Sequence, residues 1–340
     1  MSVKTLSPRV NDPEKGLERR RSNIDPAPQL RFLLKPHAAV VWSGSIPVDT
    51  KITPSEGIDA HRRYFDNPRW MKRYFDHVHR DRAFRDRWTA ALGNMTDKTV
   101  IEIGCGPGNV FSTIGLKPKT LIGIDVAAGA LEQARAVGYE PLLADAHDLP
   151  LSSAVGDIVI LNATIHHCEH MHRVLGEAGR LVAPGGLLVT DHDPQRSAYA
   201  FKGLGRWLWN ARPMLFYWAK KGYHSCRAEQ AAVLASELHH RPGDGVTYEL
   251  FEKTLRPLGF DVQIFPHNHR VGAEVLQGKR GTSTLKCRVV QILSGMNPNA
   301  PESALSLMCL ARSPLAGSRC AETIPPGVDD GFGLGNEAQH

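Results

Sequence analysis

Short apolar runs alternate with longer amphipathic segments through the middle of the chain, from Thr99 to Thr190. Five of the apolar runs predict β-strands: Thr99–Ile103, Leu121–Ile124, Pro141–Ala144, Asp157–Leu161 and Gly186–Thr190. Three segments between them are each able to form a helix: Val110–Leu116, Gly129–Val137 and His170–Val182. Strands that alternate with helices in this way predict βαβ units and a mostly parallel sheet.

One long helix is predicted ahead of this block. Asn67 is a suitable N-cap, and Pro68 suits the first helical position because its missing N–H would have no partner there. Apolar and aromatic residues then recur at helical spacing from Trp70 to Trp88, and Gly93 ends the helix.

Two further strands are predicted near the end of the chain. Phe260–Phe265 and Ser306–Ala311 are expected to pair as an antiparallel hairpin, and Thr247 is expected to cap the helix Thr247–Leu258. The predicted fold is therefore α/β: a doubly wound, Rossmann-like, seven-stranded and mostly parallel sheet with an antiparallel last strand.

The segment between the fifth strand and that helix does not fit the βαβ rhythm. Ala198–His240 is rich in Trp, Phe, Tyr, Lys and Arg, so a helical insertion is expected over residues 198–245. It could form a lid over an apolar pocket, a surface that contacts a membrane interface, or a plain packing cap. The polar ends, residues 1–28 and 313–340, are expected to be disordered, leaving one domain over residues 29–312.

Composition places the chain among ordinary globular proteins. Hydrophobic residues make up 42% and charged residues 22%, and the net charge is +6. The basic surplus is spread out and favours a solvated helix face over a nucleic-acid surface. None of the six cysteines forms a C-x-x-C pair, no secretory signal is visible, and no apolar run reaches the roughly 18 residues of a membrane span, so a cytoplasmic location is expected.

A glycine-rich loop follows the first predicted strand. It reads G-C-G-P-G-N from Gly104 to Asn109 and opens a predicted helix. Glycines suit a tight turn and a close approach of ligand to backbone, but such a loop alone is a weak signal. Asn109 stands where a dinucleotide fingerprint has its last glycine, and Pro107 removes an N–H that could contact a pyrophosphate.

Two acidic residues follow the next strands at the same predicted edge of the sheet. Asp125 ends the second strand, where a carboxylate can accept hydrogen bonds from both ribose hydroxyls. Asp145 follows the third strand, where a carboxylate can accept from an adenine amino group.

These motifs together resemble those of class I S-adenosylmethionine-dependent methyltransferases, most of all the small-molecule branch that includes ubiquinone and menaquinone methyltransferases. The matching stretches are EIGCGPGN, GIDVA, ADAHDLP, DIVILNATIHH and LVAPGGLLVTD, in that order. The resemblance implies S-adenosyl-L-methionine as cofactor and a small organic acceptor, methylated on oxygen or carbon. The cofactor-binding residues that it implies are Glu102, Gly104, Cys105, Gly106, Gly108, Asp125, Val126, Asp145, Ala146 and Asn162.

An acceptor that must lose a proton needs a base, and a histidine suits that role. The candidates are His166, His167 and His192, which follow the fourth and fifth strands. No metal is expected, because no second Cys/His pair completes a recognisable zinc motif. The H-N-H run from His267 to His269 is interpreted as a surface loop.

Other functions stay open. A nicotinamide-dependent oxidoreductase is disfavoured by Asn109 and by the second acid at Asp145. A protein that binds the cofactor without catalysis fits the same motifs. Nucleic-acid methylation is disfavoured because Asn162-Ala163-Thr164-Ile165 replaces the usual N-P-P-Y signature. The sequence does not indicate the oligomeric state.

Overall fold

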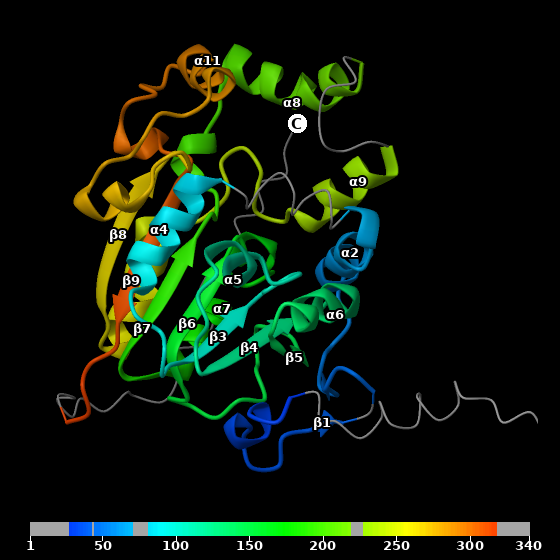
Figure 1. Cartoon of the computed structure of the whole chain (residues 1–340). Coiled ribbons are helices and arrows are strands. Elements are labelled where there is room, and N and C mark those ends of the chain that lie inside the picture. Colours follow the sequence, from blue (N-terminus) through cyan, green and yellow to red (C-terminus); the bar gives the residue numbers. More distant parts are fainter. Residues whose placement is uncertain (1–26, 43, 71–80, 219–226, 318–340) are drawn as a thin grey trace, which may run out of the picture.

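One sheet of nine strands forms the centre of the molecule (Figure 1). The computed structural model describes residues 27–42, 44–70, 81–218 and 227–317. Across the sheet the strands run β1 (Val40–Val41), β2 (Val48–Asp49), β5 (Glu140–Leu143), β4 (Thr120–Asp125), β3 (Thr99–Ile103), β6 (Gly156–Asn162), β7 (Val182–Asp191), β9 (Ser306–Arg312) and β8 (Asp261–His267). The five central strands are mutually parallel, and β9 runs antiparallel between β7 and β8.

The structure confirms the predicted α/β class, the parallel sheet and the antiparallel last strand. It adds two strands of two residues each, β1 and β2, which the sequence analysis did not predict. Such short strands carry too few residues for a periodic pattern, so they form only because the N-terminal segment lies against the edge of β5.

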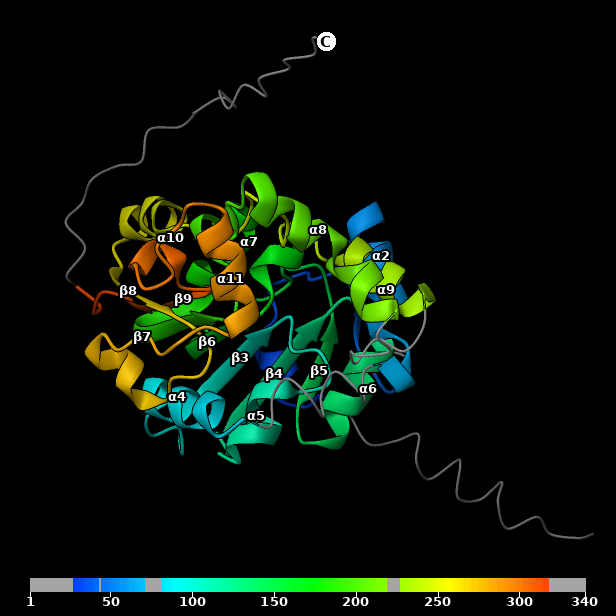
Figure 2. The same ribbon diagram turned by 90° about the horizontal axis from the view of Figure 1, so that it is seen from above.

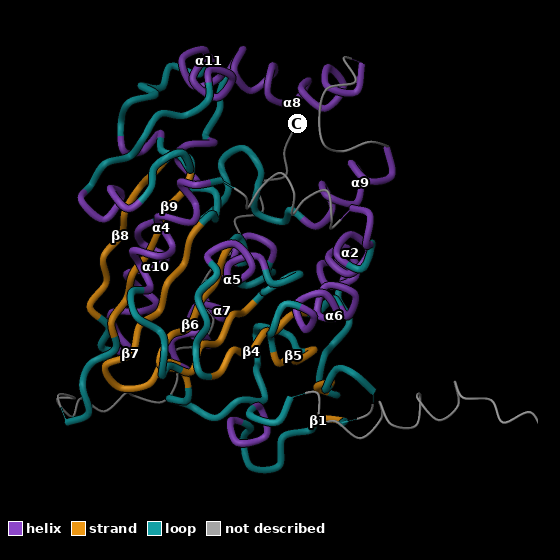
Figure 3. The backbone as a smooth tube through the Cα atoms, in the orientation of Figure 1, coloured by secondary structure: helices purple, strands orange, loops and turns teal. Residues whose placement is uncertain are grey.

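Helices cover both faces of the sheet, as Figures 2 and 3 show. Their bounds are α2 Glu56–Phe65, α4 Arg82–Leu92, α5 Asn109–Ile114, α6 Ala128–Ala136, α7 Met171–Leu181, α8 Gly203–Trp218, α9 Arg227–Ser236, α10 Tyr248–Leu255 and α11 Leu285–Leu293. Short 3₁₀ helices lie at Leu30–Leu33, Ile165–His167, Arg196–Tyr199, Arg256–Leu258, Ala273–Gln277 and Pro301–Ser303. No helix among the described residues is long and apolar enough to cross a bilayer.

Successive side chains of β3 point to opposite faces of the sheet, and each face carries its own hydrophobic core. Ile101 and Ile103 belong to the core shared with α7 and α10, whereas Val100 faces the core of α4, α5 and α6. The strand pattern therefore decides which helical layer each β3 side chain meets, and Glu102 faces the same layer as Val100.

Two expectations need correction. The helix predicted to run unbroken from Pro68 is interrupted, because Asp81 is extended and its side chain caps a new helix by accepting from the N–H of Ala83; residues 71–80 lie outside the described part. Asn67 does accept from the N–H groups of Arg69 and Trp70, as an N-cap does.

The predicted surface loop at His267–His269 is also wrong. His267 ends β8 and is fully buried, and the Asn268 side chain is 7% exposed. The predicted disordered ends fall almost wholly on residues 1–26 and 318–340, outside the described residues, although Ala27 is buried in the core.

The predicted insertion after β7 is helical. It contains α8 and α9, which lie above the carboxyl ends of the central strands in Figure 1. α9 packs on α2, and α8 packs on α11. Thr247 caps α10 as predicted, accepting from the N–H of Leu250 at 3.0 Å.

Candidate functional site

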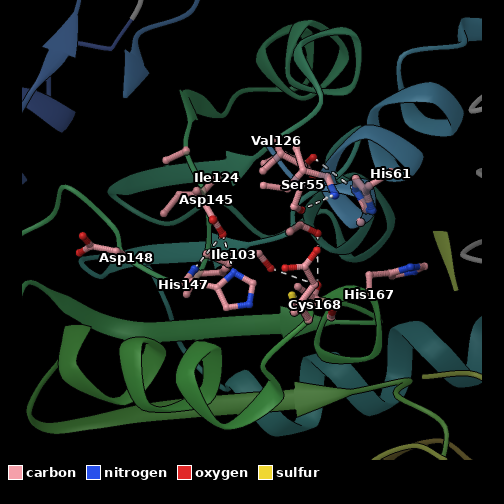
Figure 4. A pocket seen from close by; sticks show the side chains of 18 of the residues that line it. Ser55, His61, Ile103, Ile124, Val126, Asp145, His147, Asp148, His167 and Cys168 are labelled. Carbon is pink, nitrogen blue, oxygen red and sulfur yellow. Dashed lines mark hydrogen bonds and ion pairs between the residues drawn. The ribbon is translucent and has the colours of Figure 1, made fainter. Parts of the chain in front are cut away.

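The carboxyl ends of β3, β4, β5 and β6 meet at one cavity of about 380 Å³. Doubly wound sheets bind ligands at this edge. The opposite wall comes from the segment 49–65, which includes α2, and Figure 4 shows His61 on that helix across from Asp145 and His147. Of the residues predicted to bind cofactor, those on the cavity are Gly104, Gly106, Asp125, Val126, Asp145, Ala146 and Asn162.

The glycine loop has backbone angles that only glycine adopts easily. Gly104 and Gly108 have φ values of +66° and +86°. A Cβ at Gly104 would overlap the side chain of Thr164, and a Cβ at Gly108 would lie 2.8 Å from Tyr139. Packing alone therefore requires glycine at both positions, while Gly104 also borders the cavity.

Asp125 is fixed by its neighbours at the tip of β4. The N–H of Gly106 donates to its Oδ2 at 2.9 Å, and the N–H of Ala127 donates to its Oδ1 at 2.9 Å. His61 Nε2 lies 3.6 Å from Oδ1. Burial by itself would raise the pKa of Asp125, but His61 and the two amides outweigh burial and lower it. An ionised, oriented carboxylate therefore faces the cavity.

Asp145 is held in a similar way by His147. The Nδ1 atom of His147 lies 2.6 Å from Asp145 Oδ1, and its Nε2 accepts from the N–H of His170 at 3.2 Å. These two bonds fix the ring with its proton on Nδ1. Burial would raise the pKa of Asp145, but the hydrogen bonds from the ring and the backbone N–H of His147 outweigh burial and lower the pKa.

Asn162 brings the clearest unmet hydrogen-bonding capacity to the cavity. Asn162 is the last residue of β6 and is 4% exposed. Neither its Oδ1 nor its Nδ2 has a hydrogen-bond partner among the described residues. Asn109 also borders the cavity, and no described residue bonds to its Oδ1. Buried polar groups are nearly always hydrogen-bonded, so these atoms indicate a place for a polar ligand.

Three residues predicted to bind cofactor do not line the cavity: Glu102, Cys105 and Gly108. Glu102 is fully buried beneath the loop, where the Tyr139 hydroxyl donates to its Oε2 at 2.6 Å; its Oε1 has no hydrogen-bond partner within the part of the chain that the structure describes. The Cys105 side chain lies in the core with Val110 and Leu131. A role for these residues toward the cofactor stays a prediction.

Burial raises the pKa of Glu102 to about 8, against an ordinary value of 4.5, although the Tyr139 hydrogen bond lowers it in part. Between these pH values the folded state keeps a proton that the unfolded state has released. The free energy of unfolding therefore falls as pH rises from 4.5 to about 8. We expect Glu102→Gln, which stays neutral, to lack this decline.

Urea denaturation at several pH values between 5 and 8 measures the effect. The stability of Glu102→Gln relative to wild type should increase with pH, whereas Glu252→Gln, at an exposed position on α10, should track wild type. Parallel pH profiles for Glu102→Gln and wild type would refute a protonated Glu102.

The three candidate bases occupy different surroundings. Only His167 borders the cavity; its Nδ1 lies 2.6 Å from the carbonyl oxygen of Ser236, and burial together with the charge of His166 lowers its pKa to about 3. Burial would lower the pKa of His166, but Asp193 and Glu237 outweigh it and raise the pKa to about 10. His166 is thus protonated at neutral pH, which leaves His167 as the neutral ring beside the cavity.

His192 belongs to a separate buried cluster. Its neighbour Asp191 accepts from Arg87 Nε at 2.8 Å and from His267 Nε2 at 2.6 Å, and Arg87 is fully buried. Burial would raise the pKa of Asp191, but the charge of Arg87 and the two histidines hold it well below its ordinary value. The cluster ties β7 to β8 and α4, away from the cavity, and the sequence analysis missed it because His267 lies far along the chain.

Similarity to known proteins agrees with this geometry. Residues 101–190 match the family described as a methyltransferase domain. The malonyl-[acyl-carrier protein] O-methyltransferase of Yersinia pestis is 33% identical over 96 residues, which cover 28% of this chain and 36% of that protein. The fatty-acid O-methyltransferase of Mycolicibacterium smegmatis is 32% identical over 114 residues, covering 32% of this chain and 42% of that protein.

A third relative, the phthiotriol/phenolphthiotriol dimycocerosates methyltransferase of Mycobacterium leprae, is 33% identical over 108 residues, covering 30% of this chain and 40% of that protein. The matched stretch thus spans less than half of each relative. A solved S-adenosylmethionine-dependent methyltransferase from Thermotoga maritima is 18% identical, with a TM-score of 0.43 over 74% of this chain and 99% of that chain.

Residues 101–190 are thus similar to a methyltransferase domain, in agreement with the class I motifs that the sequence resembles. None of the three relatives is named as a ubiquinone or menaquinone enzyme. Membership of that branch stays a prediction.

Proposed function

We propose that this protein is an S-adenosylmethionine-dependent methyltransferase that methylates oxygen or carbon of a small, apolar organic acceptor. The observation that carries the proposal is the convergence of Gly104, Asp125, Asp145 and Asn162 on one cavity. Residues 29–312 would form the catalytic domain.

The donors and acceptors around the cavity fit the parts of this cofactor. Asp125 would accept from the ribose hydroxyls, and Asp145 would accept from the adenine amino group, beside the N–H of Ala146. The backbone at Gly104 and Gly106 would pass beneath the methionine portion, and the unpartnered amide of Asn162 would border the reacting end. When bound, the cofactor supplies a sulfonium methyl group; the chain's own task is to position the acceptor and exclude water.

An apolar acceptor is supported by two observations. Ile58 and Phe65 of α2 contribute apolar surface to the outer wall of the cavity. Two of the three relatives are named for fatty-acid and phthiotriol substrates, and the third is named for malonyl-[acyl-carrier protein]. Leu204 and Trp207 on α8 are 58% and 65% exposed. The proposal therefore includes contact of α8 with a lipid surface.

Transfer of a labelled methyl group tests the function directly. Purified protein would be incubated with methyl-labelled S-adenosylmethionine and long-chain fatty acids, acyl carrier protein thioesters or cell-extract metabolites. We expect label in an organic-soluble product. Cofactor binding without transfer to any acceptor would favour the non-catalytic alternative, and absence of binding to both the cofactor and its demethylated product would refute the proposal.

A further inference from the structure

Two histidines and a glutamate converge beside the cavity from distant parts of the chain. His166 and His167 lie in the 3₁₀ turn after β6, and Glu237 follows α9. One ring nitrogen of each histidine and a carboxylate oxygen of Glu237 all lie within 4.8 Å of one another. The sequence analysis looked for a Cys/His zinc motif and therefore did not find this set, because Glu237 lies far from the two histidines along the chain.

The spacing of the first pair already suits a bound ion. His166 Nε2 lies 3.4 Å from Glu237 Oε2. Two ligand atoms that each lie roughly 2.0–2.1 Å from a tetrahedral zinc ion are about 3.3–3.4 Å apart. A metal ion could therefore replace the direct contact between this nitrogen and this oxygen with little movement of either side chain.

The outer surroundings of both rings are those of metal-binding histidines. Such a histidine usually donates its other ring N–H to a carboxylate or a backbone carbonyl, which fixes the tautomer and the ring orientation. His166 Nδ1 lies 2.7 Å from Asp193 Oδ1, and His167 Nδ1 lies 2.6 Å from the Ser236 carbonyl oxygen. In both rings Nε2 is then the nitrogen left for a metal; in His166, which is protonated at neutral pH, binding of the ion displaces the proton on Nε2.

The polar network around these residues is incomplete. Two buried atoms have no hydrogen-bond partner among the described residues: Oδ2 of Asp193 and Nε2 of His240. The other polar atom of each side chain is bonded, Asp193 Oδ1 to His166 and His240 Nδ1 to Glu237. With Asp193 behind His166 and Glu237 in the cluster, two carboxylates also make the position favourable for a cation.

We propose that His166, His167 and Glu237 bind one divalent first-row transition-metal ion at the edge of the cavity. Two imidazoles and one carboxylate suit ions such as Zn²⁺, Co²⁺ or Fe²⁺, whereas Mg²⁺ and Ca²⁺ prefer oxygen ligands. The ion links the turn after β6 to the end of α9 and so attaches the helical insertion to the sheet. This proposal does not depend on methyl transfer.

Titration of the full-length protein with Zn²⁺ or Co²⁺ tests the proposal. After removal of metal with a chelator, we expect one ion per chain by calorimetry and elemental analysis, and a higher melting temperature with the ion than without it. Glu237→Gln and His167→Ala should each weaken binding at least about tenfold, since even residues behind the ligands have effects of that size. His172→Ala, at an exposed position outside the cluster, should bind as wild type.

Several results would overturn the proposal. One is that the wild-type protein binds no ion, and another is that Glu237→Gln binds the ion as tightly as wild type does. Should that variant fail to fold, the absorption spectrum of Co²⁺-loaded wild type gives a separate answer. A spectrum of nitrogen and oxygen ligands alone supports the site, whereas a thiolate charge-transfer band would place the ion on a cysteine and refute it.

Discussion

Replacing Asp125 by alanine is expected to lower the affinity for S-adenosylmethionine and S-adenosylhomocysteine by roughly 10- to 150-fold. Hydrogen bonds to a charged group contribute about 1.5–3 kcal/mol, and the carboxylate at the tip of β4 is already ionised and oriented. The same change frees the N–H of Gly106, so the glycine loop also loses its anchor. Isothermal titration calorimetry with both ligands measures the loss.

The matched control is Asp97→Ala, an exposed aspartate ahead of β3, which should bind both ligands as wild type does. Thermal unfolding checks that Asp125→Ala is folded at the temperature of the titration. Affinities within twofold of wild type would remove Asp125 from the ribose position.

Replacing Arg87 by methionine is expected to destabilise the fold by about 3–5 kcal/mol. The guanidinium is fully buried, and it donates to Asp191 at 2.8 Å and to the Val271 carbonyl at 2.6 Å. Removing one member of a buried ion pair leaves the other charge buried without compensation, and this uncompensated charge accounts for most of the destabilisation. Chemical denaturation at neutral pH measures the change in the free energy of unfolding.

A double variant separates charge from packing. Arg87→Met combined with Asp191→Asn removes both charges and keeps an acceptor for His267, so it should recover a substantial part of the loss. If the double variant is no more stable than Arg87→Met, the uncompensated charge of Asp191 is not the cause. A loss below about 1 kcal/mol in Arg87→Met would contradict the buried ion pair itself.

The central strands were predictable because their signal is local. β3 was predicted to the residue, and β4 and β6 to within one residue at each end, since each is a short run made mostly of apolar residues. The same runs fix where Asp125 and Asn162 emerge, so that half of the cavity follows from the sequence.

The outer wall was not predictable in the same way. α2 reads EGIDAHRRYF, a charged segment that begins with the capping Ser55 and two acidic residues in its first turn. Its place opposite Asp125 depends on packing against α9. His267 looked exposed in its polar H-N-H run, but the alternation of β8 turns it inward to Asp191. Contacts between residues so distant in the chain leave no periodic trace.

The division of the cavity between two stretches of chain has a consequence for divergence. The sheet side of the cavity belongs to residues 101–190, the part that matches the methyltransferase-domain family, whereas the outer wall comes from residues 49–65, which precede that part. Substitutions in the outer wall can change the shape of the cavity while the strand register of the sheet stays the same. A fragment trimmed to residues 101–190 would retain Asp125 and Asp145 at the ends of their strands, yet leave both carboxylates open to water.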